Sequence, residues 1–357
     1  MSPRNRILLV LTVLVWGLFL VLVKPWQGDA HERTAARVGL LFPKLQYQTE
    51  EVRKVVVSDG VNTVTLAMEE NGYWRVLEKQ HPLDKARLMM LMENLSAITT
   101  LDTVSVNAEK HEVFGVAEGQ GTRVQVYDAN EILLADWIAG SLRQQDIAAG
   151  QKPVLEFYMR DGRSDAVYLS GTAIHPSGNP TVWCDTRFLF GVDASRIQWV
   201  ERLDFETNES WRIERTGAAE QPSAQLGDAQ ENRPGGSWQL TAPKTQPALG
   251  YAGDSMAFSI TGLEATDVVA QAGTANADDT RYGFPQDRFR VGIEGQVFEF
   301  ELGKPSANSG QRFLRVTNPK LPYIYSLDDY EVSQLRQPLV RMLSDDDAAD
   351  AATESDH

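Results

Sequence analysis

The side chains in this sequence that could bind a metal are few and far apart. Its five histidines fall in segments predicted to be linker, turn, loop or tail: His31, His81, His111, His175 and His357. A Glu-Lys-His-Glu run ends at Glu112, but it lacks the second histidine four residues further on that a zinc-binding helix would carry. We therefore predict no metal and no cofactor.

Nucleophiles and paired carboxylates are equally sparse. Cys184 is the single cysteine, so the chain has no internal disulfide, and it lies in an alternating run over 181–185 that predicts an ordinary strand residue. The adjacent pairs Glu69-Glu70 and Asp328-Asp329 point apart in a strand or loop. A glycosidase needs two carboxylates that face each other across a cleft. The sequence predicts a protein that is not an enzyme, and an envelope hydrolase is only the third alternative.

Three aromatic residues are candidates for binding. Trp183, Tyr323 and Tyr325 lie on predicted strands beside turn-rich loops. Aromatic rings in such places stack on sugars or contact a protein partner. The other interpretation is that they fill the core of a small sheet.

The net charge excludes two classes of partner. It is formally −15 at pH 7. Because nucleic-acid binding depends on cationic contacts to phosphate, we expect no nucleic-acid partner. The same charge argues against a basic patch that holds an anionic lipid surface. The chain of 357 residues is 42% hydrophobic, which is enough to bury about two cores.

An uncharged, almost wholly apolar run bounded by Ile7 and Val23 predicts a transmembrane signal anchor. It is close to the shortest helix that crosses the ~30 Å hydrocarbon core. Arg4 and Arg6 precede it, which orients residues 1–6 to the cytoplasm. We expect a single-pass protein of the inner (cytoplasmic) membrane with its bulk in the periplasm. A cleaved signal peptide is the alternative, although the run is longer than a usual signal core.

The rest of the chain is predicted to be one α+β unit built twice, after a linker over 24–39. In the first unit, residues 40–196, short strands lead to Trp74 and to a turn at Pro82. Apolar residues at helical spacing over 85–101 predict an amphipathic helix. An aromatic-glycine segment at Gly115, a strand pair ending at Gly140 and a hairpin follow.

The second unit, residues 197–340, places Trp238, Gly283 and Gly303 in the same order and keeps helical spacing over 254–269. Each unit is expected to fold an antiparallel sheet against one main helix. Chance similarity between two α+β units is the alternative to a true repeat. Residues 216–236 have no apolar period and predict a flexible loop. Residues 341–357 predict a disordered acidic tail.

These motifs resemble the domain-of-unknown-function 4340 family. The matching segments are 41–43, 72–76, 82–98, 114–116, 158–160, 167–169, 238–240, 282–284, 313–316 and 323–327. The resemblance implies a bacterial envelope protein with an N-terminal membrane helix. It also implies an association with ABC-type transport systems of the gliding-motility accessory kind, and no catalytic residues.

The anchor, the repeat and the resemblance together predict a non-enzymatic accessory or scaffold subunit of an envelope complex. The expected partners are the bilayer, through the N-terminal helix, and the permease and ATPase of an ABC transporter. The alternative is an extracytoplasmic glycan- or solute-binding module that uses a cleft between the repeats.

Overall fold

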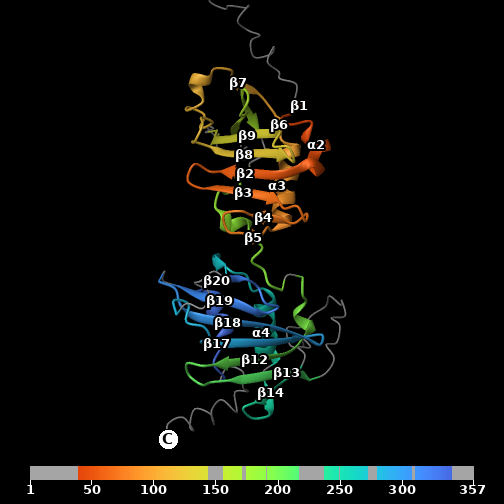
Figure 1. Ribbon diagram of the computed structural model, residues 1–357, viewed down its shortest axis with the longest axis vertical. Helices are drawn as coiled ribbons and strands as arrows, with labels where there is room; N and C mark the ends of the chain where they lie inside the picture. Colours follow the sequence, from red (N-terminus) through yellow and green to blue (C-terminus); the bar gives the residue numbers. More distant parts are fainter. Residues whose placement is uncertain are drawn as a thin grey trace, which may run out of the picture. The chain divides into compact units, whose positions relative to one another are not determined.

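The computed structural model describes residues 39–143, 156–170, 174–189, 191–216, 237–248, 250–271, 280–307 and 310–339 (Figure 1). The predicted anchor between Ile7 and Val23, the linker up to residue 38, the loop over 217–236 and the 341–357 tail lie outside the described residues. Among the residues that are described, no helix is long and apolar enough to cross a bilayer.

The first large sheet has nine strands in the order β5-β4-β3-β2-β8-β9-β10-β11-β7. These strands are β2 Val52–Ser58, β3 Thr63–Met68, β4 Trp74–Val76, β5 His81–Pro82, β7 Thr103–Ser105, β8 Thr122–Asp128, β9 Leu133–Leu142, β10 Phe157–Asp161 and β11 Val167–Ser170. Two short strands, β1 Gly39–Leu40 and β6 Thr99–Thr100, form a separate antiparallel pair.

The second large sheet has nine strands in the order β15-β14-β13-β12-β17-β18-β19-β20-β16. These strands are β12 Ile197–Asp204, β13 Trp211–Thr216, β14 Ser237–Ala242, β15 Gln246–Ala248, β16 Asp267–Gln271, β17 Asp287–Ile293, β18 Gln296–Pro305, β19 Gln311–Asn318 and β20 Tyr323–Asp328. Counted along the chain, the strands of the two sheets follow the same order.

Helices are few and mostly short. They are α2 Leu45–Gln48, α3 Lys85–Ala97, α4 Gly250–Thr261 and α5 Asp329–Leu335, with 3-10 turns η1 Thr49–Glu51, η2 Ala108–Lys110, η3 Pro180–Trp183 and η4 Ala194–Arg196. The predicted α+β class with antiparallel sheets is therefore confirmed.

The chain divides into two compact units: residues 1–78 with 85–183, and residues 79–84 with 184–357. The division differs from the expected boundary after residue 196. Within the second unit, the backbone N–H of Asp185 donates to Pro82 O over 3.0 Å, and Arg187 Nη2 lies 3.0 Å from Asp84 Oδ2. Residues 184–196 belong to the second unit because these contacts attach their first residues to the 79–84 segment.

The first core is built from the sheet and the apolar stripe of α3. Leu91 and Leu95 of α3 are buried, as are Val55, Val124 and Val126 of the central strands. The helix ends at Ala97 rather than at residue 101 as predicted, because the chain then pairs with β1 as β6.

The second core centres on the rings of Phe289 and Phe300, which stack with centroids 4.9 Å apart and planes 6° from parallel. Met256 and Ile260 of α4 are also buried, and burial of each such side chain stabilises the fold by ~1.5–3 kcal/mol. The helical spacing predicted over 254–269 is wrong at its end. The helix stops at Thr261, and Val268 pairs with β20 as part of β16.

A close backbone contact recurs in both units. In the first, Gly115 has a φ of +68°, and the carbonyl of Phe114 accepts a hydrogen bond from the Ser141 N–H over 3.0 Å. A Cβ on Gly140 would collide with that carbonyl. Glycine is therefore needed twice here, once for its positive φ and once for its missing side chain.

The second unit repeats this contact. Gly283 has a φ of +61°, and the Lys304 N–H donates to Tyr282 O over 2.9 Å. A Cβ on Gly303 would collide with the Tyr282 carbonyl. In the first unit the glycine pair thus places the loop before β8 against β9. In the second unit it places the loop before β17 against β18.

We expect Gly303→Ala to destabilise the protein by ~1–3 kcal/mol, because its new methyl group would overlap the hydrogen-bonded carbonyl of Tyr282. The matched control is Gly262→Ala, just after α4, where the nearest atom to a new Cβ is Phe258 O at 3.3 Å. This control should stay within ~1 kcal/mol of wild type. Equal denaturant midpoints for the two full-length variants would contradict the contact.

Candidate functional site

Three charged side chains occupy the core-facing side of the second sheet. Arg202 and Asp204 follow the buried Val200 at alternate positions of β12, and Asp287 precedes the buried Phe289 on β17. All three charged residues are 3% exposed or less. Because an unpaired buried charge is very costly, each must find a partner within the fold.

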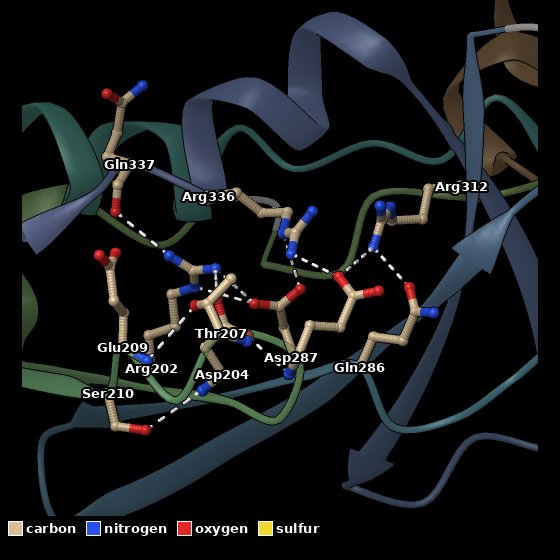
Figure 2. A network of polar contacts seen from close by, with 11 residues as sticks. Arg202, Asp204, Thr207, Glu209, Ser210, Gln286, Asp287, Arg312, Arg336 and Gln337 are labelled. Atoms are coloured by element: carbon tan, nitrogen blue, oxygen red, sulfur yellow. Dashed lines mark hydrogen bonds and ion pairs between the residues drawn. The ribbon is translucent and has the colours of Figure 1, made fainter.

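Arg202 supplies most of that pairing (Figure 2). Its Nε and Nη2 donate to Asp287 Oδ1 over 2.9 and 2.7 Å, and Nη2 also donates to Asp204 Oδ2 over 2.6 Å. Its Nη1 donates to the backbone carbonyl of Gln337 over 3.3 Å. One guanidinium therefore binds two strand carboxylates and attaches the chain that follows α5.

Two further arginines, Arg336 and Arg312, lie on the other side of Asp287. Arg336 Nε is 2.8 Å from Asp287 Oδ2, close enough for ion pairing although the angles miss hydrogen-bond geometry. Arg336 Nη2 donates to Glu206 Oε2 over 2.8 Å. Arg312 Nη1 lies 3.8 Å from the same oxygen. The Glu206 carboxylate therefore contacts both guanidinium groups.

The Asp204 carboxylate organises the turn after β12. It accepts hydrogen bonds from the backbone N–H groups of Glu206 and Thr207, over 2.8 and 2.9 Å, and from the Thr207 hydroxyl over 2.7 Å. Burial alone would raise the pKa of Asp204, but these hydrogen bonds and Arg202 outweigh it and lower the pKa below its ordinary 3.8.

Burial sets the direction in which the pKa values of Asp287 and Arg312 shift. Burial raises the pKa of Asp287 above 3.8, and its contacts with Arg202 and Arg336 offset only part of that effect. Burial also lowers the pKa of Arg312, and the like charge of Arg336 lowers it further. Both shifts indicate a site where charge is held away from water.

The fold itself does not require this cluster. Arg202 pairs with Phe289 in the second sheet, and Val57 pairs with Val124 at the corresponding position of the first sheet. Val57 is fully buried. Replacement of buried ion pairs by apolar residues is often neutral or stabilising, so the cluster is weak evidence for stability.

A cavity of about 320 Å³ adjoins the cluster, between α5 and the start of β19. Its walls include Arg312, Arg336, Gln311, Asp329 and Ser333. Its volume is at the lower end of the range typical of small-molecule pockets, ~300–1,000 Å³.

The opposite face of the second sheet carries a network of arginine and glutamate side chains. Glu301 is its most buried carboxylate, with Arg288 Nη2 at 2.7 Å and Arg315 Nε at 2.6 Å. Arg290 Nη1 contacts Glu201 Oε2 over 2.9 Å. We call this surface the arginine–glutamate face; it also includes Arg212, Glu214, Glu299 and Trp199.

Trp199 is the aromatic centre of the arginine–glutamate face. The Arg212 guanidinium lies 4.2 Å from its ring centroid, and that of Arg290 lies 5.9 Å away. A Cβ at Gly292 would collide with the indole, so the ring lies directly against the neighbouring strand. Its orientation is fixed by these contacts.

The comparisons with known proteins identify one family. The family model described as "Domain of unknown function (DUF4340)" matches residues 74–233. This segment is similar to the DUF4340 family. The predicted resemblance is confirmed over these residues. No curated protein and no solved structure matches the chain.

The DUF4340 match runs from β4, which begins at Trp74, to just before β14. Trp238 of β14 is buried, and its Nε1 donates to Asp254 Oδ1 of α4 over 2.9 Å. The Arg215 guanidinium lies 4.5 Å from the Trp238 ring centroid. Trp74 is only half-buried and pairs with Met68 of β3. The two tryptophans thus hold corresponding strand positions but make different contacts.

The three aromatic residues proposed for binding are buried. Trp183, Tyr323 and Tyr325 are 4%, 5% and 1% exposed. Trp183 lies in η3 rather than on a strand, because Asn179 accepts a hydrogen bond from the Thr181 N–H and Pro180 starts a 3-10 turn. These positions fit the alternative interpretation, in which the rings pack the core.

The structure also brings together residues that were not predicted. Among the residues it describes, no group of three or more histidine, cysteine, aspartate or glutamate side chains is placed to hold a metal ion. The sequence analysis did not single out Arg202, Asp204 and Asp287. Their alternation with Val200 and Phe289 was the available signal, because it places charges on the apolar face of two strands.

We expect Asp287→Ala to destabilise the protein by ~3–5 kcal/mol, because Arg202 and Arg336 would keep buried charge without their shared carboxylate. The matched control is Glu214→Ala, which removes a half-exposed partner of Arg212 and should cost ~0–1 kcal/mol. Denaturant unfolding of both full-length variants measures the difference. Equal losses would show that Asp287 contributes no more than a surface ion pair.

Proposed function

We propose that this protein is a non-enzymatic accessory or scaffold subunit of a membrane complex in the bacterial envelope. Its partners would be the permease and ATPase of an ABC-type transport system. The apolar run between Ile7 and Val23 would anchor it in the inner membrane, with residues 1–6 in the cytoplasm and two tandem α+β repeats in the periplasm.

The observation that carries the proposal is the arginine–glutamate face of the second sheet. Arginine and tryptophan are enriched at protein interfaces and among the residues that dominate binding energy. Trp199 is fixed against Gly292 and under Arg212, and glutamates hold the neighbouring arginines. Side chains that are already ordered lose little rotamer entropy when a partner binds, which favours association.

The pairing of the buried carboxylates supports a role without catalysis. Asp136 accepts from Arg123 Nε and Nη2 over 2.8 and 2.7 Å, and Arg202 holds Asp287 in the second unit. These guanidinium donors occupy oxygen atoms of both carboxylates within the fold. These side chains are suited to holding strands together.

The test is a crosslinked pull-down of the full-length, C-terminally tagged protein from intact membranes, read by mass spectrometry. We expect enrichment of a permease and an ATPase over a control that contains only the anchor. The double variant Trp199→Ala/Arg212→Ala should lose both partners, because it removes the aromatic centre of the face.

The matched control is Tyr251→Ala, which removes an aromatic side chain that is 72% exposed on α4 and should keep both partners. Recovery of the tagged protein alone would overturn the accessory-subunit proposal. Retention of both partners by the double variant would show that they bind at another surface.

A further inference from the structure

Two guanidinium groups line the cavity beside α5. Arg312 donates from Nη1 to Gln286 Oε1 over 2.7 Å. Within the described part of the chain, its Nε and Nη2 and the Nη1 of Arg336 donate no hydrogen bond. Both residues line the cavity, and the side chain of Arg312 is 12% exposed. Guanidinium donors in a cavity wall favour a carboxylate ligand, which matches the guanidinium geometry.

The contacts of Glu206 show how these two guanidiniums receive a carboxylate. A single oxygen of Glu206 lies 2.8 Å from Arg336 and 3.8 Å from Arg312. The Glu206 side chain is 41% exposed and is not among the residues that line the cavity. The like charges that lower the pKa of Arg312 remain close together on the cavity side.

The cavity wall also presents a negative charge. Asp329, the first residue of α5, lines the same space as the two arginines. A ligand with two carboxylates would be repelled at that end, whereas a ligand with an ammonium group would be attracted. The amide of Gln311 and the hydroxyl of Ser333 add polar atoms to the wall.

We propose that this cavity binds a small zwitterion of the free amino acid class. Arg312 and Arg336 bind its carboxylate, and Asp329 binds its ammonium group. The volume of about 320 Å³ suits a ligand of this size. The site goes beyond the accessory-subunit role and does not depend on a membrane partner.

Equilibrium dialysis of the full-length protein in detergent against radiolabelled L-alanine tests the site. We expect saturable binding of one molecule per chain. L-alaninamide, which lacks the carboxylate, and N-acetyl-L-alanine, which lacks the ammonium group, should each compete at least ~10-fold more weakly. Equal competition by N-acetyl-L-alanine would overturn the zwitterion assignment, and absence of saturable binding would overturn the site.

Variants separate the two ends of the ligand. Arg312→Gln should weaken L-alanine binding at least ~10-fold. Asp329→Asn should instead abolish the preference for L-alanine over N-acetyl-L-alanine. Arg143→Gln, which changes a half-exposed arginine of the first unit, should bind L-alanine as wild type does.

A variant that fills the cavity keeps the test decisive if Arg312→Gln fails to fold. Ser333 is exposed, and its hydroxyl donates a local hydrogen bond to Tyr330 O. Ser333→Trp should therefore fold, keep every charge of the site and lose L-alanine binding. Wild-type binding by a folded Ser333→Trp variant would show that the cavity is not the site.

Discussion

A backbone carbonyl that lies against a strand glycine sets the shape of each unit. The carbonyl of Phe114 contacts β9 at Gly140, and that of Tyr282 contacts β18 at Gly303. The contact requires a turn at positive φ just before it and a position without a side chain opposite it. The contact holds the loop before β8 against β9 in the first unit and the loop before β17 against β18 in the second.

The two units share this backbone contact but bury different side chains. At the place where the first sheet buries Val57, the second sheet buries Arg202 with two aspartates. The buried ions therefore reflect a local property of the second unit rather than a need of the fold. Their position matters because Arg336 connects Asp287 to Glu206 and to the wall of the cavity. The cluster thus orients one of the two guanidiniums that we assign to ligand binding.

The sequence was sufficient for those features that depend on local pattern. The α+β class, the antiparallel pairing and the DUF4340 family followed from strand alternation, turns and the order of motifs. The ends of the helices could not be predicted from the sequence. Thr99–Thr100 and Val268 form strand pairs that the spacing of apolar residues does not reveal. Tertiary pairing overrides propensity at such positions.

The charged cluster could be predicted only in part. Alternation places Arg202 and Asp287 on the core faces of their strands, but it does not show that two distant strands are neighbours. Arg336 follows the end of α5 and Arg312 lies at the start of β19, and only the folded chain brings them to the same cavity. Charged residues in a sequence are expected to be exposed, so buried charged sites of this kind are overlooked.

Amide hydrogen exchange of the full-length protein, read by mass spectrometry, tests the central contact most directly. The N–H groups of Ser141 and Lys304, which donate to the aromatic carbonyls, should exchange as slowly as those of the buried central strands. Both units should show this protection, since both carry the contact. Exchange at either position as fast as in the exposed turn around Val61 would contradict the account.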